Sequence, residues 1–579
     1  MQLNGVFFEK ATNQLTLLVQ TFMMFYRLNK SLPKELFSEV RFALFCLGDR
    51  AYGAQFCAAG RKLAARLVQL GAIPCCEVGY GDDGANGGVF GDFDRWLDES
   101  LLKTLPMKEE VEVLKNISNY SIEVLPVVGH QMNPEQFDDF RSGACPLTAY
   151  SYRGGTRIDI TTQSTKVPRT GRVVSNIRIT EESWQQDTRH ISIQLINEPN
   201  ETAPFLAGDV LSVFPSNSVE NVMKFLRVLP KSIQSMADFT IKINGESQSG
   251  AVPWPRQCTL RGILTHCADI QAFPEREDLR SLSYFCSDKE QSSKLLSLSE
   301  TTGAPLYNEY IVREKRTWAD VLHDFDSIKI TVDHLLMLLS PMRPRQFSIA
   351  SAPSSILDLC VAVVEGKTPL GRSYQGLCST FLRELSVGDQ VNMWISPGSF
   401  GRLPLIKAPN VKQFETPILC IGAGTGIAPL RGLIQERERV RRLMNDTDND
   451  IDESAHGGAP DNILVFGSRK ESMDFYYKDE WSSMAENNNL KLYTAFSQDN
   501  RLKIYVQQVI RDAQGGNFIT SHILENNGAV FIAGGAKMVR AVKDEIFECL
   551  AKALGDAGEA QSFLKMMQRQ GKFAVEAWS

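Results

Sequence analysis

The sequence lacks the cysteine patterns that mark zinc-binding or disulfide-rich proteins. Twelve cysteines are present among 579 residues, but none forms a C-x-x-C pair or lies at zinc-ligand spacing from a histidine. The one close pair, Cys75-Cys76, is adjacent in sequence, and adjacent cysteines rarely close a relaxed disulfide. We therefore expect free thiols in a reducing compartment, the cytoplasm, and no metal site.

Long apolar runs and a basic net charge are also lacking. The apolar stretch LTLLVQTFMMFYRL (15–28) is interrupted by Gln20, and it is shorter than the roughly 20 residues that span a bilayer. We expect it to form a buried helix, and we expect no membrane partner. The formal net charge of −6 argues against a nucleic-acid partner, because nucleic-acid-binding proteins carry a basic surface.

What is present is the hydrophobic patterning of a multidomain protein. A chain of 579 residues is long enough for three or four domains. In residues 1–125, apolar runs at 40–49 and 73–83 alternate with amphipathic stretches at 53–72 and 93–105. This alternation predicts a β-α-β-α piece of a doubly wound sheet, too small to be a whole one.

The rest of the chain divides into three parts. Residues 126–168 are rich in Gly, Ser, Thr and Pro, which is typical of a linker. Short alternating strands in residues 169–410 predict an antiparallel β-barrel, with a helical insertion at about 216–340. In residues 411–579 strands that end in turn residues alternate with helices, which predicts an α/β domain.

A glycine-rich turn opens this last domain. Gly422, Gly424 and Gly426 follow the apolar strand PILCI and precede a helix expected to begin near Pro429. Backbone N–H groups and the helix dipole at such a turn can bind a pyrophosphate. Alone the pattern is weak, since a tight turn for packing would look the same and the last glycine of the Rossmann fingerprint is missing.

Two further stretches could contact a nucleotide. In RPRQFSIASAP (343–353), Arg345 offers a guanidinium for phosphate, Phe347 offers a flat face and Ser348 a hydroxyl. In GLCSTFL (376–382), a glycine permits close backbone approach, and Ser379-Thr380 are expected to cap the next helix. Each could be a strand or a cap without function. Together they indicate one dinucleotide in the barrel and another in the α/β domain.

With these motifs in order, the chain resembles a known family. RQFS, GLCS, GAGTGIAP, AFS followed by KIYVQ, and a penultimate Trp resemble the diflavin reductases of the ferredoxin–NADP reductase superfamily. VREKRTWADVLHDF (312–325) is similar to the cytosolic NADPH-dependent diflavin oxidoreductases among them. The resemblance covers residues from about 22 to 579. It implies a partial flavodoxin-like domain, an FAD-binding barrel and an NADP-binding α/β domain.

The resemblance also implies two dinucleotide sites. FAD would be bound by the barrel motifs, an upstream arginine and the penultimate tryptophan: Arg316, Arg345, Gln346, Phe347, Ser348, Gly376, Leu377, Cys378, Ser379 and Trp578. NADPH would be bound through Thr425, Arg469, Ser497, Gln498, Lys503, Ile504, Tyr505, Val506 and Gln507. Catalysis would fall to Ser348 at the flavin edge, Glu576 near the nicotinamide and Trp578 stacked on the flavin. The alternative for Trp578 is a structural anchor of the last strand, FAVEAW.

An FMN site is implied less firmly. Its residues would come from the loop CLGDRAYGAQF and a later acid: Cys46, Leu47, Gly48, Asp49, Tyr52 and Asp82. The family's Ser/Thr-rich phosphate loop and a second Thr/Gly loop are missing from this sequence, so FMN binding stays open. Two other departures matter. Gln498 replaces a usual arginine of the 2′-phosphate site, and Ala533 stands where P450 reductases have a cysteine.

The function implied is hydride transfer from NADPH to FAD, followed by single-electron transfer through FMN to an iron–sulfur acceptor of the anamorsin type in cytosolic iron–sulfur cluster assembly. Two alternatives remain, an FAD-only NADPH reductase and a non-catalytic isoform that competes for the partner. Two alternative families, the methionine synthase reductases and the P450 reductases, fit less well. The number of flavins per chain (two, one or none) separates the active, FAD-only and non-catalytic forms.

Overall fold

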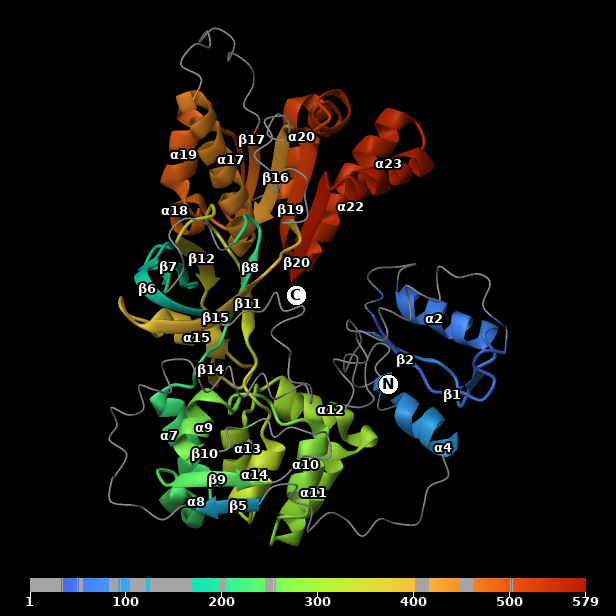
Figure 1. Cartoon of the computed structure of the whole chain (residues 1–579), viewed down its shortest axis with the longest axis vertical. Coiled ribbons are helices and arrows are strands. Elements are labelled where there is room, and N and C mark those ends of the chain that lie inside the picture. Colours follow the sequence, from blue (N-terminus) through green and yellow to red (C-terminus); the bar gives the residue numbers. More distant parts are fainter. Residues whose placement is uncertain are drawn as a thin grey trace. The chain divides into compact units, whose positions relative to one another are not determined.

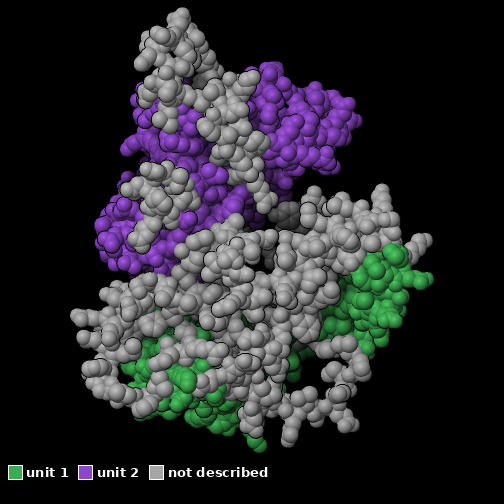
Figure 2. Space-filling model, in the orientation of Figure 1, with its two compact units in different colours: residues 1–162, 216–342, 366–374 green, residues 163–215, 343–365, 375–579 purple. Residues whose placement is uncertain are grey.

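The computed structural model describes residues 33, 35–48, 50, 56–82, 92–93, 95–104, 121–124, 169–196, 205–244, 254, 257–400, 416–447, 462–499, 501 and 503–578. The stretch 15–28, the predicted linker 126–168, Asp49 and Tyr52 lie outside these residues. The chain divides into two compact units (Figure 2). One comprises residues 1–162, 216–342 and 366–374, and the other comprises 163–215, 343–365 and 375–579.

Six antiparallel strands form a nearly closed barrel in the second unit (Figure 1). Their order is β11-β8-β15-β6-β7-β12, and a bridge between Ile349 and Leu359 links the two end strands. Alternate residues such as Ile191 and Ile193 face the barrel core, as the period of two in a strand requires. The antiparallel barrel predicted from the sequence is confirmed. Its elements are β6 (Arg169–Arg178), β7 (Thr188–Leu195), β8 (Val210–Val213), β11 (Arg345–Ser348), β12 (Ile356–Ala362), β15 (Gln390–Ser396) and helix α15 (Leu377–Glu384).

A parallel sheet of order β18-β17-β16-β19-β20 forms the other part of this unit. Helices cover both faces (Figure 1), with α17 and α19 on one side and α20, α22 and α23 on the other. Ile418 and Cys420 face the first group, while Leu419 and Ile421 face the second. Burial on both faces explains the continuous apolar run of this strand, and the predicted α/β domain is confirmed. The strands are β16 (Ile418–Ala423), β17 (Asn462–Ser468), β18 (Lys491–Phe496), β19 (Ala529–Gly535) and β20 (Phe573–Trp578). The helices are α17 (Ile427–Thr447), α18 (Glu471–Asp474), α19 (Lys478–Glu486), α20 (Val506–Asp512), α21 (Phe518–Thr520), α22 (Ala536–Leu554) and α23 (Ala557–Arg569).

The insertion belongs to the first unit and is mainly helical. Its core contains Trp254 and Trp318, which are almost fully buried. The sequence patterns did not predict its small sheet of order β10-β9-β5, in which β5 comes from far upstream. The strands are β5 (Ser121–Val124), β9 (Thr240–Asn244) and β10 (Gln257–Thr259). The helices are α7 (Val219–Val228), α8 (Lys231–Met236), α9 (Leu260–His266), α10 (Arg276–Ser283), α11 (Lys289–Ser299), α12 (Ala304–Tyr307), α13 (Trp318–Asp324) and α14 (Val332–Leu338). A short hairpin, β13 (Glu365–Lys367) and β14 (Ser373–Gln375), follows the barrel strand β12.

The N-terminal part contains parallel β-α-β structure, as the alternating pattern predicts. Each predicted strand is broken in two, so that β1 (Arg41–Phe42) pairs with β3 (Ile73–Pro74) and β2 (Phe45–Gly48) pairs with β4 (Gly79–Asp82). Cys46 packs with helix α2 (Ala58–Gln69), while Phe45 packs on the opposite face against Phe93 and Trp96. A short helix α4 (Leu102–Thr104) follows. Within the described part of the chain, no helix is both long and apolar enough to cross a membrane.

Candidate functional site

The glycine-rich turn lies at the carboxyl edge of the parallel sheet. Strand β16 has β17 on one side and β19 on the other, and the crevice at such a reversal of strand order is where α/β sheets bind dinucleotides. Gly424 has a φ of +55°, and a Cβ on Gly426 would come within 2.2 Å of the Ala533 carbonyl oxygen. Helix α17 begins at Ile427, two residues before the expected start. No described side chain caps this turn, so its N–H groups can donate hydrogen bonds to an anion.

Three adjacent strand ends bring the predicted NADPH residues to this edge. Thr425 lies in the turn, Arg469 follows β17 and Ser497 follows β18. The N–H of Ser497 donates to the Ser468 carbonyl at 3.0 Å, and that of Gln498 to the Arg469 carbonyl at 2.7 Å. The Ser468 hydroxyl is buried, and none of the described residues is its hydrogen-bond partner. An unpaired buried hydroxyl beside an open helix N-terminus fits a polar ligand such as a dinucleotide.

Some residues of the segment after β18 are exposed and others are buried. Lys503, Ile504 and Tyr505 are exposed, and Tyr505 is the N-cap residue of α20. The Val506 side chain is buried in the core, so only its backbone can face a ligand, and Gln507 is half-buried. After the neighbouring strand β17, Arg469 and Lys470 each lie 5.9 Å from the ring of Trp184 in the β6–β7 turn.

The RQFS motif forms the barrel strand β11. Gln346 is exposed, whereas Arg345, Phe347 and Ser348 are half-buried. Arg345 donates through Nη1 to the Arg343 carbonyl at 2.7 Å, and Phe347 packs against the barrel core. The strand therefore presents a cation, a ring and a hydroxyl in one short run.

The GLCS motif forms the start of α15, and here one expectation was wrong. The helix begins at Leu377 with Gly376 as N-cap, so Ser379 and Thr380 lie inside it and do not cap it. The Ser379 hydroxyl instead accepts the Val364 N–H at 3.0 Å and donates to the Gly376 carbonyl at 3.2 Å. No side chain in the described ranges caps α15.

The open start of α15 fits the FAD pyrophosphate. Its first N–H groups can bind an anion together with the helix dipole. A Cβ on Gly376 would come to 2.8 Å from the Val364 Cβ, which explains the glycine. Leu377 is half-buried, and Cys378 is buried in the barrel core, where burial raises its thiol pKa to about 12. Cys378 is therefore an inert packing residue.

Ser348 and Glu576 meet although 228 residues separate them. The Ser348 hydroxyl donates to Glu576 Oε1 at 2.5 Å, which joins β11 of the barrel to β20 of the parallel sheet. Burial raises the pKa of Glu576, and the hydrogen bond from Ser348 opposes that rise. Glu576 Oε2 is also buried and has no partner within the described part of the chain. This pair can hold a proton beside a hydroxyl at the sheet edge.

Trp578 lies at the end of the same strand. Its backbone pairs with Gly535 of β19, and its side chain remains 37% exposed. The backbone is therefore anchored in the sheet, while the indole is available to contact a ligand.

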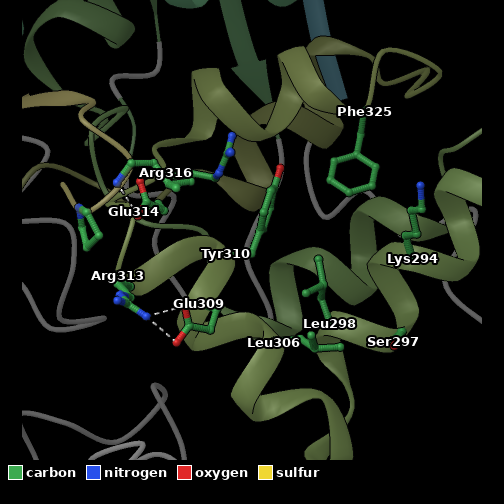
Figure 3. A pocket seen from close by; sticks show the side chains of 12 residues that line it. Lys294, Ser297, Leu298, Leu306, Glu309, Tyr310, Arg313, Glu314, Arg316 and Phe325 are labelled. Atoms are coloured by element: carbon green, nitrogen blue, oxygen red, sulfur yellow. Dashed lines mark hydrogen bonds and ion pairs between the residues drawn. The ribbon is translucent and has the colours of Figure 1, made fainter.

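Arg316 belongs to the first unit, in the segment between α12 and α13. It lines a pocket of about 550 Å³ (Figure 3), whose walls include Leu298, Leu306 and Phe325. Its guanidinium lies 4.3 Å from the Tyr310 ring centroid and is hydrogen-bonded to Asp324.

The predicted FMN residues that the structure describes lie in two paired strands. Cys46, Leu47 and Gly48 are in β2, and Gly48 pairs with Asp82 at the end of β4. The Asp82 carboxylate accepts the Arg50 N–H at 2.9 Å and lies 3.4 Å from the Arg50 Nε. Asp82 thus contacts Arg50, two residues after the end of β2.

One polar cluster was missed by the sequence reasoning. Arg431 in α17 is buried and donates to Asp358 of the barrel and to Glu480 of α19. Its neighbours Leu430, Leu433 and Ile434 are core residues, so the detectable signal was an arginine among apolar residues in the first two turns of α17.

Three family models match the chain. They are described as flavodoxin (residues 8–96), FAD binding domain (162–381) and oxidoreductase NAD-binding domain (420–544). The flavodoxin match extends the resemblance upstream of the expected start at about residue 22. It also bears out the flavodoxin-like part of the predicted fold class.

Similar curated proteins cover almost the whole chain. The NADPH-dependent diflavin oxidoreductase 1 of Danio rerio is 32% identical over 95% of this chain and 87% of its own length. The protein of the same name from Mus musculus is 31% identical over 95% and 87%. That of Emericella nidulans is 28% identical over 95% and 85%.

Proposed function

This chain belongs to the NADPH-dependent diflavin oxidoreductases, and on that premise we propose that it passes electrons from NADPH through FAD to an iron–sulfur protein. Family membership and the three matched domains already imply electron transfer from NADPH. When bound, NADPH supplies a hydride to FAD, and the flavin can release electrons singly. The finer proposal concerns the acceptor, an iron–sulfur protein of the anamorsin type in cytosolic cluster assembly.

The barrel supplies the groups that would hold FAD. The N–H groups at the start of α15 and the guanidinium of Arg345 would bind the pyrophosphate. The half-buried ring of Phe347 would contact the bound cofactor, and the exposed indole of Trp578 would stack on the flavin. Together these residues would hold FAD in the barrel, beside β20.

The sheet edge supplies the groups that would orient NADPH. The turn at Gly424–Gly426 would bind its pyrophosphate through backbone N–H groups. Exposed Lys503 and Tyr505 and the half-buried Ser497 would contact the 2′-phosphate. Arg501 is also exposed and offers a cation where Gln498 replaces the family's arginine.

The contact between Ser348 and Glu576 is the observation that carries the proposal. It joins the predicted FAD strand to the predicted NADPH sheet at their common edge. Burial raises the pKa of Glu576, and the Ser348 hydroxyl orients the carboxyl group by donating to Oε1. The two side chains would therefore help to position the flavin and nicotinamide rings, and they would form no covalent bond with either.

Anaerobic stopped-flow absorbance tests the activity. NADPH should bleach the bound flavin, and Ser348→Ala should slow the bleaching roughly 100-fold, as loss of an aligned donor does in other sites. Ser354→Ala is a matched control, because Ser354 is exposed and its hydroxyl bonds to the Ile356 carbonyl, two residues away. Equal rates for wild type and Ser348→Ala would refute the role of the contact.

The acceptor needs its own test. A purified iron–sulfur protein of the anamorsin type, mixed with the chain and NADPH, should lose its visible cluster absorbance as it is reduced. If ferricyanide is reduced rapidly while the iron–sulfur protein stays oxidised, the proposed acceptor is wrong and the NADPH–FAD step stands.

A second candidate is an FAD-only reductase. The Ser/Thr-rich phosphate loop of the FMN domain does not occur in this sequence, which favours that form for the chain as given. Fluorimetric quantitation of flavins after acid release separates the two forms, because the complete form retains FAD and FMN in near-equal amounts.

A further inference from the structure

A buried arginine joins helix α17 to the chain just beyond the Ser348 strand. Arg431 lies one turn into α17 and is only 9% exposed. Its Nη1 donates to the Ala350 carbonyl at 2.8 Å and to Asp358 Oδ2 at 3.0 Å. Its Nε donates to Glu480 Oε2 at 2.7 Å. Since Ala350 is two residues after Ser348, the guanidinium holds the segment that extends from β11.

A second contact lies one helical turn later. Gln435 accepts the Ala352 N–H at 3.2 Å and donates to Glu480 Oε1 at 2.7 Å. Between the two, Gly432 lies against the same segment, because a Cβ there would come within 2.9 Å of the Ser351 carbonyl oxygen. Residues 350–352 are thus docked on one face of α17 at three successive points.

The charges at this contact are compensated and held in place. The Arg431 Cζ lies 4.4 Å from the Tyr477 ring centroid, and two carboxylates share its donors. The second oxygen of Asp358 accepts the Ser192 hydroxyl at 2.8 Å. These partners hold the buried guanidinium in one orientation. Loss of a partner would leave a charge buried and unpaired.

The N-terminus of α17, about one turn before Arg431, carries the predicted NADPH site. The turn at Gly424–Gly426 runs directly into the helix at Ile427. Arg431 is four residues further on, about 6 Å along the axis of an α-helix. Helix α17 therefore begins at the glycine-rich turn and contacts residues 350–352 within its first three turns.

We propose that Arg431 and Gln435 are positioning residues that fix the Ser348 strand relative to the glycine-rich turn. They would thereby set how closely the rings bound at the two sites approach one another. This consequence rests on the proposed function, whereas the docking of residues 350–352 on α17 does not. A misplacement of about 1 Å can lower a reaction rate about 100-fold, so a loosened contact should be visible in turnover.

Hydrogen–deuterium exchange tests the docking. The peptide that contains Ala350 and Ala352 should exchange faster in Arg431→Met and in Gln435→Leu than in wild type. Arg437→Met is the matched control, because Arg437 is buried in the same helix and bonds to Asn462 and Thr416 of the parallel-sheet domain. Equal protection in Arg431→Met, Arg437→Met and wild type would overturn the proposal.

Kinetics with FAD-loaded protein tests the positioning role. In Arg431→Met the kcat for ferricyanide reduction should fall about 10- to 100-fold, with KM for NADPH and FAD content little changed. The primary deuterium isotope effect with C4-deuterated NADPH should rise, and Arg431→Lys should recover part of the rate. Arg437→Met should lower the melting temperature but leave kcat and the isotope effect unchanged.

Two outcomes would distinguish failure of the positioning role from failure of the proposed function. If Arg431→Met lowers only the melting temperature, as the control does, the positioning role is refuted. If wild type does not oxidise NADPH but the exchange difference holds, the proposed function fails and the docking stands. Gln435→Leu covers the case in which Arg431→Met does not fold, because it leaves the bonds of Arg431 intact. Its exchange and kcat should change in the same direction but less.

Discussion

At the residue scale, the protonation of Glu576 is coupled to folding. Burial raises its pKa, so the folded protein holds this proton more tightly than the unfolded chain. Stability from this group is therefore full below the ordinary value of 4.5 and is lost as pH rises through the folded-state pKa. The loss is ~1.4 kcal/mol for each pH unit between the two values. Glu576→Gln avoids it, so the melting temperature of the variant minus that of wild type should increase between about pH 4 and pH 8.

Ser348→Ala provides the opposite control. It removes the hydrogen bond that lowers the pKa of Glu576, so its stability should fall more steeply with pH than that of wild type. Scanning calorimetry across a pH series measures both effects. A constant difference between Glu576→Gln and wild type would show that Glu576 titrates normally.

Trp578 allows a prediction about cofactor preference. If its indole stacks on the flavin, nicotinamide must displace it, and the 2′-phosphate contacts of NADPH supply binding energy that NADH lacks. Stacking contributes about 0.5–1.5 kcal/mol beyond burial, so Trp578→Ala should raise kcat/KM with NADH relative to NADPH roughly 2- to 10-fold. Steady-state kinetics with both cofactors measures the ratio. An unchanged ratio with FAD still bound would leave Trp578 as a structural anchor of β20.

At the element scale, the turn before α17 contains two glycines that are needed for different reasons, one for its backbone conformation and one for lack of space. Gly424 has a positive φ but open space around its Cβ position, whereas a Cβ on Gly426 would collide with the Ala533 carbonyl. Gly424→Ala should cost about 1–2 kcal/mol of stability through left-handed strain. Gly426→Ala should cost more, because two backbones must separate, and it should also weaken binding of 2′,5′-ADP. Thermal unfolding and isothermal titration would compare them, and equal losses would contradict this account.

What the sequence revealed at this scale was local. We could locate the glycine-rich turn, the RQFS strand and the GLCS helix because each is a short contiguous motif. The contact of Ser348 with Glu576 could not be found from the residues alone, since no local pattern links positions 228 apart. Ser379 was mistaken for a cap because the helix begins two residues earlier, at Leu377. The ion pairs of Arg431 were overlooked because its partners Glu480 and Asp358 lie 49 and 73 residues away in sequence.

At the scale of the whole molecule, the order of domains was visible in the sequence but their internal detail was not. The switch from alternating to helical periodicity located the barrel and the insertion. Strand β5 pairs with β9, more than 100 residues downstream, and short pairings of this kind leave no periodic signal. Strand β1 and strand β2 form one apolar run in sequence but pair with different partners, β3 and β4.

The last prediction concerns how far electrons travel along the 579-residue chain. Gly48 and Asp82, two of the predicted FMN residues, end two paired strands, but the sequence has no Ser/Thr-rich loop to bind the FMN phosphate. A phosphate without such a cradle loses several charge-assisted hydrogen bonds, each worth about 1.5–3 kcal/mol. The purified chain should therefore retain FAD but little FMN. Ferricyanide, which can take electrons from FAD, should be reduced much faster than cytochrome c, and adding free FMN should not close the gap. Near-equal amounts of the two flavins, or similar stopped-flow rates with both acceptors, would show that electrons reach a bound FMN.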